Sequence, residues 1–396
     1  MRTNAKAGVV RGSLLTDPQA RAWAFQIVAV IAVVAFGWFL FHNTQTNLAH
    51  RGITSGFGFL DNAAGFGIPQ HLIDYSESDT YGRVFWVGLL NTLLVSVIGI
   101  ILATIIGFIL GVGRLSPNWL IRQIATVYIE VFRNIPPLLQ IFFVYFAVLS
   151  PLPGPRNSLS LWDIIFINNR GVQMPAPSAG EGFWPFWMAL ALALALIAIV
   201  LLNRWARARR HATGQTFPVF WISLGLFIGI PWLSSLVFGG PFLWEIPELR
   251  RFNIRGGWVV IPELVSIVLA LSIYTAAFIG ETVRAGIQSV SHGQTEAAAS
   301  LGLRPGRVLR LVIVPQALRV IIPPLTSQYL NLAKNSSLAA AIGYPDMVSL
   351  FAGTVLNQTG QAIETMAITM SVYLAISISI SLLMNWYNKR IALIER

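Results

Sequence analysis

Long runs of apolar residues constrain this chain more than any other feature of its sequence. A helix needs roughly 20 mostly apolar residues to cross the hydrocarbon core of a membrane, and six segments approach that length. They are residues 23–41, 84–113, 185–202, 217–238, 259–280 and 365–387. The chain is 55% hydrophobic and only 11% charged, which is too apolar for a soluble domain of this length. The sequence therefore predicts an all-α integral membrane protein.

Two weaker segments, 124–149 and 317–342, bring the expected number of spans to about eight. An even number of spans places both termini on the same side. With the N-terminus inside, the inner segments hold 18 of the 27 lysines and arginines and the outer loops hold seven. Positive charge accumulates on the cytoplasmic side of membrane proteins, so we expect cytoplasmic N- and C-termini. The net charge of +11 is thus explained by membrane topology rather than by nucleic-acid binding.

The segments group into a core and several additions. Intramembrane charges and proline-broken spans fall in 82–149 and 259–388, which we interpret as two parts of one functional core. Residues 1–81 provide a cytoplasmic N-terminus, an extra span and an outer loop, and residues 389–396 form a cytoplasmic tail. Between the core parts, 150–258 is an insertion. We expect its first part, 150–184, to be irregular because it is rich in proline, glycine and serine. We expect 185–238 to form a lipid-facing hairpin of two spans around a basic turn.

Common catalytic signatures are missing from the sequence. The chain has no cysteine, and its five histidines show no spacing typical of metal ligands. No phosphate-binding loop, HExxH or GxSxG pattern occurs. We therefore expect a protein that is not itself an enzyme.

A polar loop at 284–314 contains the signature of a short helix. Ser291 and Gln294 form a capping-box pattern that predicts a helix beginning near His292. Gly302 fits the left-handed position at the end of that helix, and Pro305 prevents its continuation. The alanines that follow Glu296 make this helix slim enough to enter a groove of a partner. The capping pattern alone favours an ordinary surface helix between membrane spans.

Charges within the predicted spans mark candidate residues of a substrate pathway, because a charge in the bilayer costs about 2.5 to 3.5 kcal/mol. The first group is Glu130, Arg133, Asn134 and Gln140, around two prolines that should interrupt the helix and leave carbonyl groups free to line a cavity. A self-compensating ion pair between Glu130 and Arg133 is the alternative.

Two further groups carry charge. In the first, Lys334 precedes Asn335, Ser336 and Ser337, and Asn335 or Ser336 is expected to cap a new half-helix whose N-terminus attracts an anion. A lysine that extends to the outer interface is the alternative. In the second, Glu281 lies three residues before Arg284, which favours an interfacial salt bridge. A carboxylate that faces a transported ammonium group is the other interpretation.

The loop and its neighbours together resemble a known family. Glu296, Ala297, Ala298, Gly302 and Pro315 match the EAA signature of bacterial ABC-importer permeases, in which Val312 and Val314 replace the usual isoleucine and leucine. Five further segments resemble the polar-amino-acid branch of that family: GLLNTLLVSV from residue 88, VFRNIPPLLQ from 131, GETVRAGIQSV from 280, PQALRVIIPPL from 315 and LAKNSSLAAAIG from 332. The extra first span and the inserted hairpin resemble the larger permease subunit of general L-amino-acid importers of Gram-negative bacteria.

The resemblance implies a type I importer permease in the bacterial inner membrane. Its coupling helix at 291–303 docks on a separate ATPase subunit, and the coupling residues are Ser291, Gly293, Gln294, Glu296, Ala297, Ala298 and Gly302. The implied partners are a second homologous permease, giving a heterodimer, two ATPase subunits that bind ATP and magnesium, and a periplasmic amino-acid-binding protein. The chain itself binds no cofactor. An ion-gradient-driven secondary amino-acid transporter is the alternative, since it also uses broken helices and buried charges.

Overall fold

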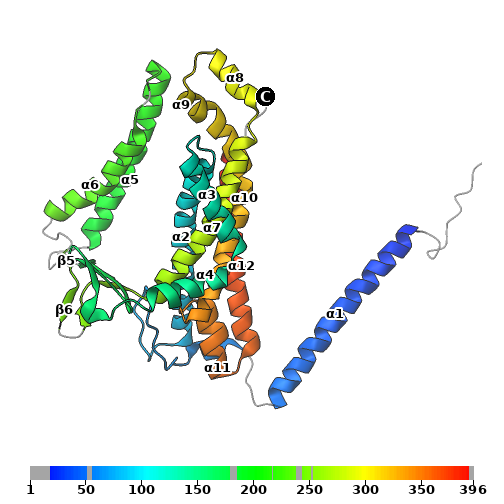
Figure 1. Cartoon of the computed structure of the whole chain (residues 1–396). Helices are drawn as coiled ribbons and strands as arrows, with labels where there is room; N and C mark the ends of the chain where they lie inside the picture. Colours follow the sequence, from blue (N-terminus) through cyan, green and yellow to red (C-terminus); the bar gives the residue numbers. More distant parts are fainter. Residues whose placement is uncertain are drawn as a thin grey trace, which may run out of the picture. The chain divides into compact units, whose positions relative to one another are not determined.

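The computed structural model describes residues 18–50, 56–178, 185–215, 217–237, 243–250 and 253–391. The ends assigned to the cytoplasm, 1–17 and 392–396, lie outside these ranges. Within them six helices are long and apolar enough to span a membrane, and a bent helix pair brings the number to seven. A further apolar helix at Val219–Ser234 is shorter. These eight elements correspond to the eight predicted segments, so the mainly helical membrane fold is confirmed (Figure 1).

The helices and strands follow one another in a long series. The α-helices are α1 (Pro18–His50), α2 (Tyr81–Arg114), α3 (Trp119–Asn134), α4 (Pro137–Phe142), α5 (Pro185–Thr213), α6 (Val219–Val237), α7 (Pro262–Gln288), α8 (His292–Ser300), α9 (Pro305–Val308), α10 (Val314–Asn335), α11 (Leu356–Thr359) and α12 (Ala362–Ile391). The 3-10 helices are η1 (Phe57–Asp61), η3 (Pro155–Asn157) and η5 (Ser336–Ile342), and the π-helices are η2 (Phe143–Leu149), η4 (Leu309–Ile313) and η6 (Val348–Val355).

The chain divides into two compact units. The first comprises residues 1–89 and 347–374, and the second comprises 90–346 and 375–396. Helices α2 and α12 therefore each contribute to both units. All of the predicted functional residues fall in the second unit.

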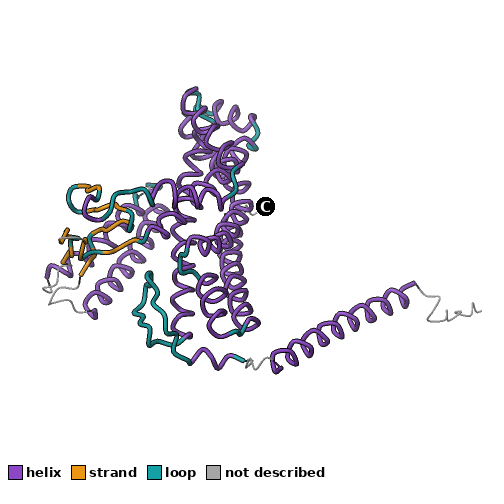
Figure 2. Tube along the Cα trace, turned by 60° about the horizontal axis from the view of Figure 1, so that its bottom comes forward, coloured by secondary structure: helices purple, strands orange, loops and turns teal. Residues whose placement is uncertain are grey.

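Short strands occupy the loop that the sequence predicted to be irregular, so that prediction was wrong (Figure 2). Strands β1 (Leu159–Leu161), β2 (Ile165–Asn168), β3 (Gly171–Met174) and β8 (Trp258–Val260) form an antiparallel sheet in that order. Two further pairs join β4 (Ala176–Ser178) to β5 (Leu243–Glu245) and β6 (Glu248–Arg250) to β7 (Asn253–Arg255). The abundant proline and glycine mark turns, but the apolar and β-branched residues between them pair as strands.

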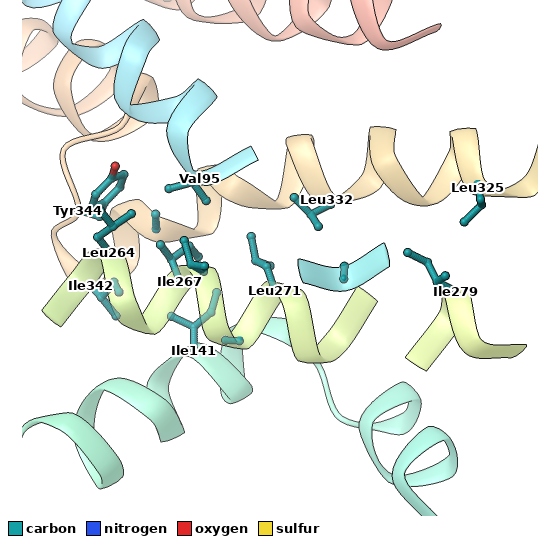
Figure 3. Packing of buried hydrophobic residues seen from close by; sticks show 14 of the residues in the cluster. Val95, Ile141, Leu264, Ile267, Leu271, Ile279, Leu325, Leu332, Ile342 and Tyr344 are labelled. Carbon is teal, nitrogen blue, oxygen red and sulfur yellow. The ribbon is translucent and has the colours of Figure 1, made fainter. Parts of the chain in front are cut away.

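Helix α7 is the centre of the second unit. Of the 18 consecutive residues that form the most apolar stretch of α7, 67% are buried, against 28% of the corresponding stretch of α2. Side chains of α7 such as Leu271 and Ile279 pack against α10 residues such as Leu332 in one apolar cluster (Figure 3). In the same cluster Ile141 of α4 lies beneath α7. A helix surrounded by helices in this way is fixed by packing on several sides, so a movement of α7 must also move its neighbours.

Glycines allow α2 and α7 to approach closely. Gly107 and Gly111 are four residues apart on α2, and therefore on the same face. A Cβ atom at Gly107 would lie 2.5 Å from a methyl carbon of Ile279, and one at Gly111 would lie 2.7 Å from the carbonyl oxygen of Gly280. No other residue fits at these positions without a shift of the backbone. This spacing of small residues is a common helix-packing pattern in membranes.

Candidate functional site

The predicted loop helix is present as α8, which runs from His292 to Ser300. It ends as the sequence predicted, because Gly302 adopts a left-handed φ of +75°. The N–H of Gly302 donates to the Ala299 carbonyl at 2.9 Å, and the N–H of Leu303 donates to the Ala298 carbonyl at 3.3 Å. These hydrogen bonds satisfy carbonyl groups that a helix end otherwise leaves open. The loop therefore holds α8 as a defined rod.

The capping box at the start of α8 is not formed, and this part of the prediction was wrong. Ser291 is the residue that caps the helix, but its side chain makes no capping hydrogen bond. The backbone closes the turn instead, since the N–H of Gln294 donates to the Ser291 carbonyl at 3.0 Å. The side chain of Gln294 contacts α10 instead, because Gln294 Oε1 accepts a hydrogen bond from Gln316 Nε2 at 3.4 Å. Gln294 thus ties the loop helix to α10 rather than to its own N-terminus.

Most of α8 is open to solvent. Of its nine residues only Ala298 is buried, while Gly293, Glu296 and Ala297 are exposed. His292 Nδ1 lies 3.0 Å from Glu296 Oε1, and these two side chains remain 86% and 73% exposed. Leu301, just after the helix, is 81% exposed, although it is a large apolar residue. Sequence reasoning did not single out Leu301. The sequence signal that could have identified Leu301 is a large apolar residue directly after a short loop helix.

A cluster of ion pairs joins α2, α3 and α7. Arg114 Nη1 lies 2.6 Å from Glu281 Oε2, and Arg114 Nη2 lies 3.0 Å from Glu130 Oε1. Glu281 also accepts from Arg284 Nε, at 3.1 Å to Oε1 and 3.0 Å to Oε2. Side chains of Arg114, Glu281 and Arg284 are 20%, 25% and 27% exposed, whereas Glu130 is 54% exposed. Glu281 is therefore the shared anion of two arginines in a partly dehydrated setting, where charge pairs are stronger than in water.

The structure corrects the predicted partner of Glu130. Arg133 does not pair with it. Instead, the Arg133 guanidinium lies 5.3 Å from the centroid of the Phe278 ring on α7, a distance typical of a cation–π contact. Arg114, which the sequence suggested only as an inner-side charge, occupies the place beside Glu130. The predicted Glu281–Arg284 pair is confirmed, and Arg114 extends it across the helices.

The break between α3 and α4 is built by Gln140 as well as by the prolines. The helix axis bends by 107° here. Gln140 Nε2 donates to the carbonyls of Phe132 and Ile135, both at 3.0 Å. These carbonyls were expected to be free to line a cavity, and that expectation was wrong for both. Asn134 is also engaged, since its Nδ2 donates to the Glu130 carbonyl at 2.7 Å. Both amides therefore support the broken backbone.

The predicted half-helix after Lys334 does not begin anew. Helix α10 continues through Asn335, which has helical dihedral angles, into the 3-10 helix η5. Hydroxyls of Ser336 and Ser337 donate backwards to the carbonyls of Ala333 and Lys334, at 2.8 and 2.7 Å. Because the helix is continuous, no helix N-terminus with free N–H groups is created here. The predicted anion site at a capped helix start was wrong, although the Lys334 side chain remains exposed.

The two groups of candidate residues lie far apart in the second unit. A Cβ atom at Gly99 of α2 would lie 3.1 Å from Leu332, two residues before Lys334. Arg114 follows Gly99 by 15 residues on the same helix, which corresponds to about 22 Å. Glu130, Arg133 and Glu281 therefore gather near the end of α2, whereas Lys334 and Asn335 lie near its middle. The structure does not join them in one site.

These features together define a class. The chain has helices long and apolar enough to span a membrane, a charged cluster near the end of α7, and the exposed helix α8, which begins after three further residues. The family described as "Binding-protein-dependent transport system inner membrane component" matches residues 211–393. The chain belongs to the amino-acid ABC transporter permeases, because its similarity to curated members extends over almost its full length.

Two relatives and one solved structure illustrate this similarity. The putative amino-acid ABC transporter permease protein YhdX of Escherichia coli (strain K12) is 62% identical over 99% of both chains. The general L-amino acid transport system permease protein AapQ of Rhizobium johnstonii is 53% identical, covering 97% of this chain and 95% of AapQ. A crystal structure of an amino acid ABC transporter with histidines gives a TM-score of 0.46 at 20% identity, covering 78% of this chain and 95% of that one. The family match and the two relatives, rather than the solved structure, identify the chain as an inner-membrane permease.

Proposed function

We propose that this chain is the larger permease subunit of an ATP-driven importer of L-amino acids. The full-length similarity to AapQ, whose name describes a general L-amino acid transport system, supports this cargo class. ATP and magnesium bind to a separate ATPase subunit, and both termini of the permease lie in the cytoplasm. The complex contains a second, homologous permease, two ATPase subunits and a periplasmic amino-acid-binding protein.

The exposed helix α8 is the observation that supports this proposal most. It is a slim rod held by defined hydrogen bonds at its end, with Glu296, Ala297 and Leu301 all open to solvent. A large apolar side chain that is 81% exposed, on a loop that also presents the exposed Glu296 carboxylate, is suited to a groove that has an apolar floor and a basic rim. We propose that this groove belongs to the ATPase subunit.

The ion-pair cluster connects this docking helix to the transmembrane path. Only three residues separate the end of α7 at Gln288 from the start of α8 at His292. A displacement of α8 therefore acts directly on α7, which carries Glu281. Through Arg114 the same movement reaches α2 and α3. We propose that the cluster keeps these helix ends together while ATP binding and hydrolysis move them between two arrangements.

The experiment is reconstitution of the permease pair, the ATPase and the binding protein into lipid vesicles. Glu296→Lys reverses the charge that α8 presents, and Leu301→Ser removes its exposed apolar anchor. Each is expected to reduce amino-acid-stimulated ATP hydrolysis at least tenfold, while the protein still inserts into the membrane. Arg304→Gln, an exposed position outside α8, is the matched control. Normal stimulation in both the Glu296 and the Leu301 variant would contradict the docking role, and uptake by the permease without ATPase would favour a secondary transporter.

A further inference from the structure

The inserted hairpin carries a concentration of positive charge that the transport proposal does not use. Within eight residues at the end of α5 lie Arg204, Arg207, Arg209, Arg210 and His211. No aspartate or glutamate occurs anywhere between residues 182 and 244. The arginines therefore have no carboxylate in the hairpin with which to pair, and they are exposed. A set of positive charges without internal partners is suited to an external anion.

Two of these arginines line a cavity. Arg207 and Arg210 are three residues apart and thus share one face of α5. The cavity is open to the surface, has a volume of about 170 Å³ and is lined by Asn203, Ala206, Arg207, Arg210, Phe217 and Val219. Side chains from the end of α5 form one wall, and the start of α6 forms the other. The cavity is thus lined by two arginines of α5 together with apolar residues from both helices of the hairpin.

The two arginines of the cavity differ from their neighbour Arg209. Arg209 Nη2 donates to Gln215 Oε1 at 3.0 Å, and its guanidinium lies 5.3 Å from the centroid of the Trp205 ring. In contrast, the side chains of Arg207 and Arg210 make no hydrogen bond or ion pair with any residue that the structure describes. Arg209 is therefore held within the hairpin, whereas the two cavity arginines, like Arg204 outside the cavity, remain available.

The cavity also lies where the apolar part of the hairpin ends. Asn203 directly follows the apolar run of α5, on which Leu196 and Leu201 are 55% and 59% exposed. At the start of α6, Phe220 and Trp221 are 70% and 69% exposed. An anion in the cavity therefore has uncovered apolar helix surface next to it. Aromatic residues at such a level are typical of a membrane interface.

We propose that this cavity binds the phosphate group of an anionic phospholipid, with its acyl chains on the exposed apolar surfaces of α5 and α6. Guanidinium groups bind phosphate oxygens through paired hydrogen bonds, and basic clusters just inside a membrane span attract anionic lipids. The inside bias of positive charge explains why arginines lie on this side. It does not explain why two unpaired arginines line one cavity while a third is paired.

Lipid binding by the full-length protein, purified in detergent and freed of lipid, tests the proposal. Native mass spectrometry compares phosphatidylglycerol with phosphatidylcholine of the same chain length. Arg207→Gln with Arg210→Gln is expected to weaken phosphatidylglycerol binding roughly 30-fold and to leave phosphatidylcholine unchanged. Arg204→Gln with Arg209→Gln removes the same charge outside the cavity, and binding is expected to fall less than fivefold. Equal losses in the two double variants would overturn the cavity as the site.

Two further measurements separate the remaining possibilities. Inorganic phosphate at millimolar concentration is expected not to displace phosphatidylglycerol, because it has no acyl chains. Complete displacement would show a site for free anions and would overturn the lipid proposal. If the glutamine variant fails to fold, Arg207→Lys with Arg210→Lys takes its place, since it keeps the charge and loses the paired hydrogen bonds. Its binding is expected to weaken severalfold, and an affinity equal to that of the unchanged protein contradicts the proposal.

Discussion

The Arg114 guanidinium bridges two carboxylates on different helices, with 2.6 Å from Nη1 to Glu281 Oε2 and 3.0 Å from Nη2 to Glu130 Oε1. Each nitrogen meets its own acceptor, so the orientation of the planar group is set by both helices. Since Arg114 is the last residue of α2, it fixes where that helix ends relative to α3 and α7. The two carboxylates differ in exposure, at 25% for Glu281 and 54% for Glu130. The contacts of Glu281 should therefore matter more.

Glu281→Gln is expected to destabilise the protein by about 1 to 3 kcal/mol, because the change leaves Arg114 and Arg284 without their shared anion. Glu130→Gln is the matched control, since it removes one carboxylate from the same arginine at a more exposed place. We expect a cost of at most about 1 kcal/mol for that change. Denaturant unfolding in detergent measures both. Equal losses would show that Glu281 is not the central anion of the cluster.

Gly111→Ala is expected to disturb the packing of α2 on α7. The added methyl group would lie 2.7 Å from the Gly280 carbonyl oxygen and 2.6 Å from Val283 Cβ, and backbone cannot yield as a flexible side chain does. Overpacking of this kind costs about 1 to 3 kcal/mol. Gly113→Ala is the control two residues on, where the methyl group would meet Ile121 at an ordinary 3.5 Å. Thermal unfolding should separate the two variants. A drop of the same size at Gly113 would indicate a general cost of losing glycine from α2.

Features encoded by local sequence were predictable. The apolar segments predicted the membrane helices, and Gly302 with Pro305 predicted where the loop helix ends. These features depend on residues close together in the chain, so hydrophobicity and backbone preference suffice. The strands of the inserted loop were missed: β1, β2 and β3 form local hairpins, but β3 also pairs with the distant β8 and β4 with β5. Such pairing is decided by tertiary contacts.

Partners of the candidate side chains could not be predicted for the same reason. Glu130 and Arg133 are three residues apart, yet Glu130 pairs with Arg114 and Arg133 lies over Phe278. Gln140 was assigned to a pathway from its polarity, whereas its amide supports the backbone at the proline break. The contacts of side chains at a broken helix depend on which neighbours the fold brings close. The sequence thus indicated which residues are unusual, and the structure shows what they contact.

Gln140→Leu is expected to destabilise the break between α3 and α4. The change preserves size but removes the amide that donates to the carbonyls of Phe132 and Ile135. Both carbonyls are part-buried, so the cost of a fully buried carbonyl without a donor, about 1 to 3 kcal/mol, is the upper limit of the expected loss. Asn134→Ala serves for comparison, because the Asn134 amide serves a single carbonyl of its own helix, and its loss is expected to cost less than about 1 kcal/mol. Unfolding in detergent gives both values. If Gln140→Leu is the milder of the two, the break does not depend on Gln140.

We propose that the exposed Lys334 ammonium, on α10, contributes to binding the carboxylate of the transported amino acid, and Lys334→Ala tests this role. A lost charge-assisted hydrogen bond weakens binding by roughly 1.5 to 3 kcal/mol. The amino-acid concentration for half-maximal ATP hydrolysis is therefore expected to rise at least tenfold in reconstituted vesicles. Ser337→Ala is the control, since its hydroxyl donates to the Lys334 carbonyl and is not available to a ligand. An unchanged concentration dependence in Lys334→Ala would remove this residue from the substrate path.

Gly302→Pro is expected to abolish coupling by disrupting the end of α8. Proline fixes φ near −65°, whereas Gly302 has a φ of +75°, and it lacks the N–H that donates to the Ala299 carbonyl at 2.9 Å. Gly302→Asn is the matched control, because asparagine tolerates left-handed backbone and no atom lies within 4 Å of the added Cβ position. We expect amino-acid-stimulated ATP hydrolysis to fall at least tenfold in the proline variant and less than threefold in the asparagine variant. Normal stimulation with proline at this position would mean that the shape of α8 is not what the ATPase recognises.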